Sequence, residues 1–182
     1  ELIRDTILKA KEKNIPIVTS MGGVAASGGY WVAASTDYIF AENLTITGSI
    51  GVASVLFNAE ETFNKIGLNE DGISSSVFTD AFNGILFDEP NERTINLYRM
   101  TIKNVYDKFV KIVSEGRNVS IEKVNEIAMG RVWTGKQALD LDLVDEIGSL
   151  NDAIKKAADL SNSENYNTKR FNQRINPLLD FI

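Results

Sequence analysis

Ser27 is the residue in this sequence whose surroundings best suit nucleophilic chemistry. It lies in the segment SMGGVAASGGY, residues 20–30, between Ala26 and Gly28. Because these neighbours are small, the hydroxyl and the local backbone can be approached closely. The segment follows a short β-branched run and opens a helix, so the Gly28 N–H is expected at a helix N-terminus, where the dipole favours negative charge. A serine nucleophile at this place would have an oxyanion donor beside it.

Two other interpretations of this segment remain open. Serine is a leading helix N-cap residue, so Ser27 could simply accept a hydrogen bond from the first helical turn. A glycine-rich connection between a strand and a helix can also cradle a phosphate. The segment contains neither GxxxxGK[ST] nor GxGxxG, and nucleotide binding is therefore the weaker alternative.

The base that would activate Ser27 cannot be a histidine of this chain. The 182 residues include no His and no Cys, which removes imidazole bases, thiol nucleophiles and thiolate metal sites. Lysine is the obvious remaining candidate, and an unprotonated lysine requires desolvation. The carboxylates Asp140, Asp142, Asp145 and Glu146 lack the spacing of an EF-hand loop and are interpreted as a solvated face and turn. We expect neither a metal nor an organic cofactor.

Charge and hydropathy narrow the range of partners. The net charge of −6 argues against nucleic acid, because phosphate binding needs a basic face, and against electrostatic docking to an anionic membrane. The sequence contains no apolar run of about 18 residues, so no transmembrane helix is expected within it. The first residues already have a helical pattern and include no initiating Met, so we expect the chain to be a fragment of a longer protein.

Alternating helices and short apolar strands predict an α/β fold with a largely parallel sheet. We expect helices at residues 2–14, 25–35, 59–66, 92–115 and 150–160. Strands are expected at residues 17–19, 38–41, 52–56 and 73–77, with a loop over residues 80–90. Residues 1–160 are expected to form one domain, and residues 161–182 a polar tail that is poorly ordered as far as Pro177.

The expected helix at residues 92–115 is the strongest in the chain. Its apolar residues repeat at spacings of three and four, which indicates a stripe that faces the core or an oligomer interface. These residues are Ile95, Tyr98, Ile102, Val105, Phe109 and Ile112. Beyond this helix, Ser120 is expected to cap a short helix, and Thr134 and Gln137 have capping-box spacing for the next one.

Several separated segments resemble the motifs of the signal peptide peptidase A (protease IV) family, in the family's order. They are residues 20–30 for the nucleophile motif, TGSIGV at residues 47–52 for the second signature, and GRVWTG at residues 130–135, followed by Ala138, and LVDEIG at residues 143–148 for the C-terminal signatures. The resemblance extends over about residues 16–158. It implies a Clp-protease/crotonase-like fold built of ββα units.

The resemblance also implies an activity and a place. The implied activity is that of a serine endopeptidase with a Ser/Lys dyad, which degrades cleaved signal peptides through an acyl-enzyme. The implied location is the bacterial inner (cytoplasmic) membrane, with the catalytic domain on the extracytoplasmic side and the anchor outside this chain. On matching positions, Ser27 is the nucleophile, Gly28 supplies one oxyanion N–H, and Ser49 holds the catalytic lysine. The second oxyanion donor would come from a glycine-rich turn upstream.

The base lysine is where this chain departs from the short members of the family. Those members carry it after the second signature, where this chain has DGISSSVFTDAF at residues 71–82, without a lysine. In long tandem-domain (67K) members, the C-terminal domain supplies the serine and the N-terminal domain the lysine. The chain resembles that C-terminal domain, so we expect its base in an N-terminal domain of the same protein. Lys65 and Lys136 are interpreted as solvated helix residues.

Two other functions stay open at this point. A crotonase-like acyl-CoA hydratase or isomerase would share the implied fold, but it needs acidic catalytic residues near two oxyanion N–H groups. A non-catalytic oligomerisation domain would instead use the apolar stripe of residues 92–115 as its functional surface. For the peptidase, the expected partners are peptide substrates, its own N-terminal domain and further copies of itself, because the family forms rings.

Overall fold

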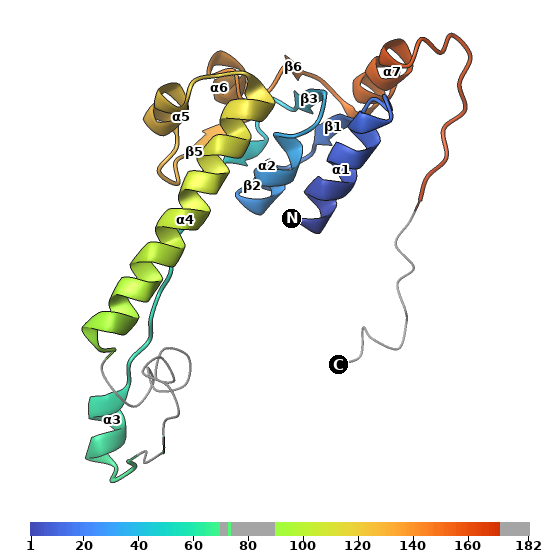
Figure 1. Ribbon diagram of the computed structural model, residues 1–182. Coiled ribbons are helices and arrows are strands. Elements are labelled where there is room, and N and C mark those ends of the chain that lie inside the picture. The colour runs from blue at the N-terminus through green and yellow to red at the C-terminus, as the bar shows by residue number, and fades with distance from the viewer. Residues whose placement is uncertain (70–72, 74–89, 172–182) are drawn as a thin grey trace, which may run out of the picture.

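The computed structural model describes residues 1–69, 73 and 90–171, and its strands form two three-stranded sheets (Figure 1). One sheet has the order β1-β3-β6 and is parallel throughout, with β1 at Val18–Met21, β3 at Tyr38–Ala41 and β6 at Glu146–Ile147. In the other sheet, β2 (Val24–Ala26) pairs parallel with β4 (Ile46–Gly48), which pairs antiparallel with β5 (Val132–Thr134). The expected α/β class with largely parallel pairing is confirmed.

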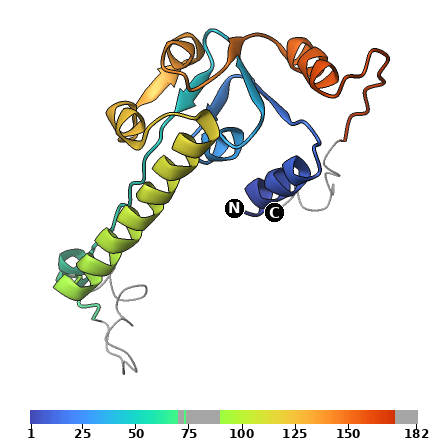
Figure 2. The same ribbon diagram turned by 45° about the horizontal axis from the view of Figure 1, so that its top comes forward.

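Helices surround these sheets. They are α1 (Leu2–Glu12), α2 (Gly28–Ala33), α3 (Glu60–Lys65), α4 (Glu92–Arg117), α5 (Ile121–Ile127), α6 (Gly135–Asp140) and α7 (Leu150–Leu160). Figures 1 and 2 show α1, α2, α5, α6 and α7 gathered around the strands, whereas α4 extends away from this body and has α3 near its outer end. In both views the segment that connects β4 to α3 runs alongside α4.

The predicted apolar stripe of α4 has two environments. Phe109 and Ile112, near the end of the helix that joins the body, are buried in the hydrophobic core. Val105, further along the projecting part, has 41% of its surface exposed, and the stripe residues before it, Ile95, Tyr98 and Ile102, are only half-buried. The stripe is therefore core-facing over its last turns only.

The predicted helix starts are confirmed where they rest on capping side chains. Ser120 accepts a hydrogen bond from the Lys123 N–H at the start of α5. Thr134 and Gln137 form a reciprocal capping box at the start of α6. Short polar side chains at these places satisfy N–H groups that have no acceptor within the helix.

Two predicted elements are wrong. The expected helix at residues 25–35 begins only at Gly28, because Val24–Ala26 pairs with β4 as a strand. The expected strand at residues 52–56 has no strand partner among the described residues, and residues 53–57 are exposed. The expected strand at residues 73–77 and the loop at 80–90 lie almost wholly outside the described residues.

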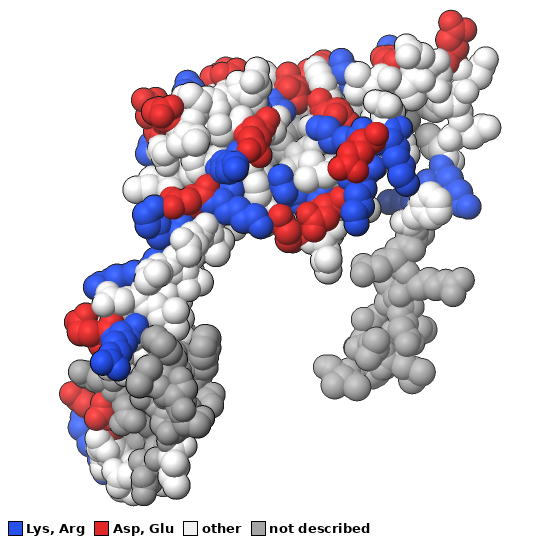
Figure 3. Space-filling view, viewed as in Figure 1, with Lys and Arg blue, Asp and Glu red and all other residues white. Residues whose placement is uncertain are grey.

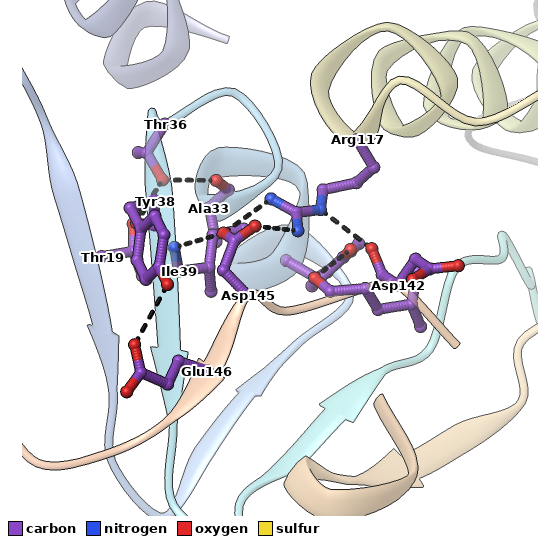
Figure 4. Close-up of polar contacts among 11 residues, drawn as sticks. Thr19, Ala33, Thr36, Tyr38, Ile39, Arg117, Asp142, Asp145 and Glu146 are labelled. Carbon is purple, nitrogen blue, oxygen red and sulfur yellow. Dashed lines mark hydrogen bonds and ion pairs between the residues drawn. The ribbon is translucent and has the colours of Figure 1, made fainter. Parts of the chain in front are cut away.

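An ion pair joins the end of α4 to the β1-β3-β6 sheet (Figure 4). The Arg117 guanidinium donates to both carboxylate oxygens of Asp145, at 3.0 and 2.7 Å, and the Arg117 side chain is only 8% exposed. Asp145 also accepts the Ile39 N–H at 2.7 Å. The interpretation of Asp145 as a solvated residue is therefore wrong. Elsewhere, positive and negative side chains are interspersed on the face shown in Figure 3.

Candidate active site

Ser27 lies between the end of β2 and the start of α2 in a strained backbone conformation. Its φ is 52° and its ψ is −116°, and its hydroxyl accepts no hydrogen bond from the helix. A non-glycine residue in such a sparsely populated region costs about 1–3 kcal/mol, and such residues cluster at functional sites. The interpretation of Ser27 as a hydroxyl cap is therefore wrong.

Hydrogen bonds on both sides of Ser27 hold this conformation. Its N–H donates to the Gly48 carbonyl oxygen at 2.9 Å, and its own carbonyl accepts the Trp31 N–H at 2.9 Å. The strand before it is fixed by the buried Thr47, whose hydroxyl donates to the Ala25 carbonyl at 2.8 Å. The elbow at Ser27 is thus clamped between β4 and the first turn of α2.

Ser49 leaves the neighbouring strand at the same edge of the sheet. Ala26 pairs in parallel with Gly48, so Ser27 and Ser49 each follow the carboxyl end of paired strands. Ser49 has a φ of 50°, and its N–H donates to the Arg131 carbonyl at 2.7 Å. Within the described residues, the hydroxyl groups of Ser27 and Ser49 neither donate nor accept a hydrogen bond. Both are free to contact an incoming group.

Gly48 shapes this turn, and a larger residue there would be strained. Its φ is +76°, a region that L side chains rarely adopt. A Cβ atom added there would lie 2.8 Å from Cδ1 of Trp133. The signature at residues 47–52 therefore has a geometric reason for its glycine, which places Ser49 beside Ser27.

Ser27 and Ser49 open into one cavity of about 850 Å³, a size typical of ligand pockets. Its other described lining residues come from three segments: Gly51, Val52 and Ala53 after β4; Arg99, Ile102, Lys103, Tyr106 and Asp107 on α4; and Met129 and Gly130 before β5. Most of this described lining is apolar, and its charged members, Arg99, Lys103 and Asp107, all lie on α4. An apolar groove beside a free serine hydroxyl is suited to bind an extended apolar chain.

Gly28 is the first residue of α2 and is exposed beside Ser27. The N–H groups of a first helical turn have no acceptor within the helix. A Cβ atom added at Gly28 would meet nothing within 4 Å, so a substrate oxygen could approach this backbone. The role of Gly28 as an oxyanion donor stays a prediction.

Lys103 is the lysine that lines the cavity among the described residues. Its side chain is 72% exposed and pairs with Asp107 at 2.5 Å. A lysine base must be desolvated, and this exposed side chain is not. Lys65 and Lys136 are exposed helix residues away from the cavity, as expected. No lysine in the described part of the chain meets the requirements of the base.

Tyr30 is a supporting residue that the sequence reasoning did not single out. It is fully buried, one turn after Ser27, and its hydroxyl donates to the Leu143 carbonyl at 2.7 Å. Burial raises the pKa of this hydroxyl well above its ordinary value, so it stays a neutral donor. The bond anchors α2 to the segment LVDEIG. A tyrosine inside a stretch of small residues was the available signal.

Comparisons with known proteins decide the family. The profile described as Peptidase family S49 matches residues 9–164. The chain belongs to peptidase family S49. Among curated S49 relatives it is 41% identical to "Protease 4" of Haemophilus influenzae over 89% of this chain, and 38% identical to "Protease 4" of Salmonella typhi over 88%. It is 36% identical to "Serine protease SPPA, chloroplastic" of Arabidopsis thaliana over 87%.

This S49 chain corresponds to only part of those relatives. It spans 26% of each of the two bacterial proteins and 23% of the Arabidopsis protein. Among solved structures it is similar to an enoyl-CoA hydratase/isomerase family protein from Hyphomonas neptunium, with a TM-score of 0.43 and 15% identity over 86% of this chain and 41% of that one.

Proposed function

We propose that this S49 chain is the nucleophile-bearing domain of a serine endopeptidase, with Ser27 as the nucleophile. The observation that carries the proposal is the Ser27 backbone at φ 52° and ψ −116°. In this conformation the Ser27 hydroxyl makes no capping hydrogen bond to α2, and the residue lines the apolar cavity. Strain of this kind persists only where surrounding structure holds it. The names of the relatives, "Protease 4" and "Serine protease SPPA", support the same activity.

The reaction starts with attack of the Ser27 Oγ on the carbonyl carbon of the scissile peptide bond. The hydroxyl proton passes to an unprotonated lysine, which later delivers it to the leaving amine. The Gly28 N–H donates a hydrogen bond to the oxyanion, and the Ser49 hydroxyl orients the lysine ammonium. Water then hydrolyses the acyl-enzyme and releases the second peptide.

The lysine comes from an N-terminal domain of the same protein, and the second oxyanion donor comes from a glycine-rich turn upstream of this chain. The described lysines support this part of the proposal. Lys103, the one that lines the cavity, is exposed and ion-paired and so is unsuited to act as the base. Residues 1–160 would then be the C-terminal, nucleophile-bearing domain, followed by the tail at residues 161–182.

The proposed substrates are remnants of cleaved signal peptides at the extracytoplasmic side of the bacterial inner membrane. Signal peptides contain an apolar run of about 7–15 residues, which matches the apolar lining near Ser27. Among the described helices, none has the length and hydropathy needed to cross a bilayer. Self-association is part of the proposal, since the projecting half of α4 leaves Met100 and Val105 exposed.

Acyl-CoA hydration or isomerisation is less well supported. Such chemistry needs an acidic group aimed at the substrate. The one carboxylate in the described lining is Asp107, and it is already paired with Lys103. We therefore retain the peptidase alone.

The test is peptide hydrolysis by the full-length protein. Wild type should cleave apolar peptides, and Ser27→Ala should lower kcat to background. Ser161→Ala, at an exposed serine after α7, is the matched control and should be fully active. The isolated chain of residues 1–182 should hydrolyse peptides poorly. Robust hydrolysis by it would refute the hypothesis that the catalytic base lies outside this chain.

A further inference from the structure

Helix α4 carries two cations into the cavity that holds Ser27. Arg99 and Lys103 are four residues apart, so they lie on one face of the helix, and both line the cavity. Ile102 and Tyr106 lie on the same wall. The groove is thus apolar with a local positive edge.

The two cations differ in how they are partnered. Lys103 forms an ion pair with Asp107, with 2.5 Å between Nζ and Oδ2. Arg99 donates to the neutral amide oxygen of Asn96 at 3.3 Å, and within residues 1–69, 73 and 90–171 no carboxylate pairs with it. Arg99 is therefore the cation of the groove that retains its capacity to bind an anion.

We propose that Arg99 binds a carboxylate of the peptide substrate and so makes the groove prefer peptides with a negative charge near the cleaved bond. This inference rests on the proposed function and adds a specificity-determining residue to it. The carboxylate belongs either to an acidic side chain or to the C-terminus of a short peptide. Both present the same two oxygens to a guanidinium, which binds them through parallel hydrogen bonds.

Physical arguments favour this role over that of an ordinary surface arginine. The neighbouring wall is apolar, so a bound peptide would displace water and strengthen the ion pair. The chain carries a net charge of −6, which disfavours acidic peptides unless a cation meets them locally. Arg99 meets that need in the cavity that Ser27 also lines.

The experiment uses the full-length protein and one apolar fluorogenic peptide. Glu or Gln is placed in turn at each position within about three residues of the cleaved bond, and each peptide is made with a free and an amidated C-terminus. We expect one Glu position, or the free C-terminus, to raise kcat/KM about 3- to 10-fold over its neutral counterpart. The arm that shows the gain identifies the source of the carboxylate.

Arg99→Gln should lower kcat/KM for the charged peptide to the value for its neutral counterpart, whereas Arg99→Lys should retain part of the difference. Lys111→Gln removes the same charge from α4 outside the cavity lining, at a residue paired with Glu115, and should change nothing. If the preference for the charged peptide survives Arg99→Gln, or if wild type shows no preference, this inference is overturned. Cleavage of neutral peptides by wild type would still uphold the proposed function. Absence of any cleavage by wild type overturns both.

Discussion

The Ser27 N–H donates a 2.9 Å hydrogen bond to the carbonyl oxygen of Gly48, and this bond joins the two turns that carry the candidate catalytic serines. Gly48 has a positive φ, and the next residue is Ser49. A direct backbone contact therefore links the turn of the nucleophile to the turn of the residue proposed to hold its base.

Gly48→Ala tests this coupling. The added Cβ would lie 2.8 Å from Cδ1 of Trp133 at a φ of +76°, so the free energy of unfolding should fall by about 1–3 kcal/mol. Peptidase activity should fall as well, because both serines move. Urea denaturation and kcat measure the two effects. Gly22→Ala, where a Cβ meets nothing within 4 Å, is the control, and equal effects of both variants would contradict the argument.

Ser49→Ala separates catalysis from stability. Its hydroxyl has no hydrogen bond within the described residues, so the free energy of unfolding should change by less than about 0.5 kcal/mol. Loss of a hydrogen bond to the charged lysine should lower kcat about 10- to 100-fold, with KM little changed. Steady-state kinetics of the full-length protein would decide. An unaltered kcat removes Ser49 from the mechanism.

Asp145→Asn should destabilise the domain. The change leaves the Arg117 guanidinium, only 8% exposed, without its carboxylate, and we expect a loss of about 2–4 kcal/mol in the free energy of unfolding. Glu115→Gln breaks the exposed pair with Lys111 and serves as the control, with an expected change below about 0.5 kcal/mol. Two variants of equal stability in urea would show that burial does not decide the effect.

The cap of α7 predicts a pH effect. Hydrogen bonds from the Ser149 hydroxyl and N–H lower the pKa of Asp152 below its ordinary value. A lowered pKa in the folded state stabilises the helix above the unfolded-state pKa, and this contribution disappears as pH falls through the lowered value. NMR titration should show the depressed pKa, and Ser149→Ala should raise it. An Asp152 pKa that Ser149→Ala leaves unchanged would exclude the cap as its cause.

Local signals in the sequence were sufficient for much of the fold. The helix ends at Ser120 and Thr134 were predictable because short polar side chains cap them directly. The helix at residues 25–35 was misplaced because Val24–Ala26 forms a strand only through pairing with Ile46–Gly48, a contact that local propensity does not contain.

The candidate site was predictable only in part for the same reason. Motif resemblance selected Ser27, Gly28 and Ser49, and strand pairing brings the two serines to one edge of the sheet. Arg99 could not be found from sequence, because it reaches the cavity only through the packing of α4 against the body. Tyr30 was missed because its partner, the Leu143 carbonyl, is 113 residues away.

The most direct test of the account is covalent labelling of the full-length protein by a serine-directed phosphonate, followed by peptide mass spectrometry. We expect one labelled residue, Ser27, and no labelling in Ser27→Ala, while Ser49→Ala is labelled more slowly. Labelling that persists unchanged in Ser27→Ala, or that is found on another serine, would contradict the assignment of the nucleophile.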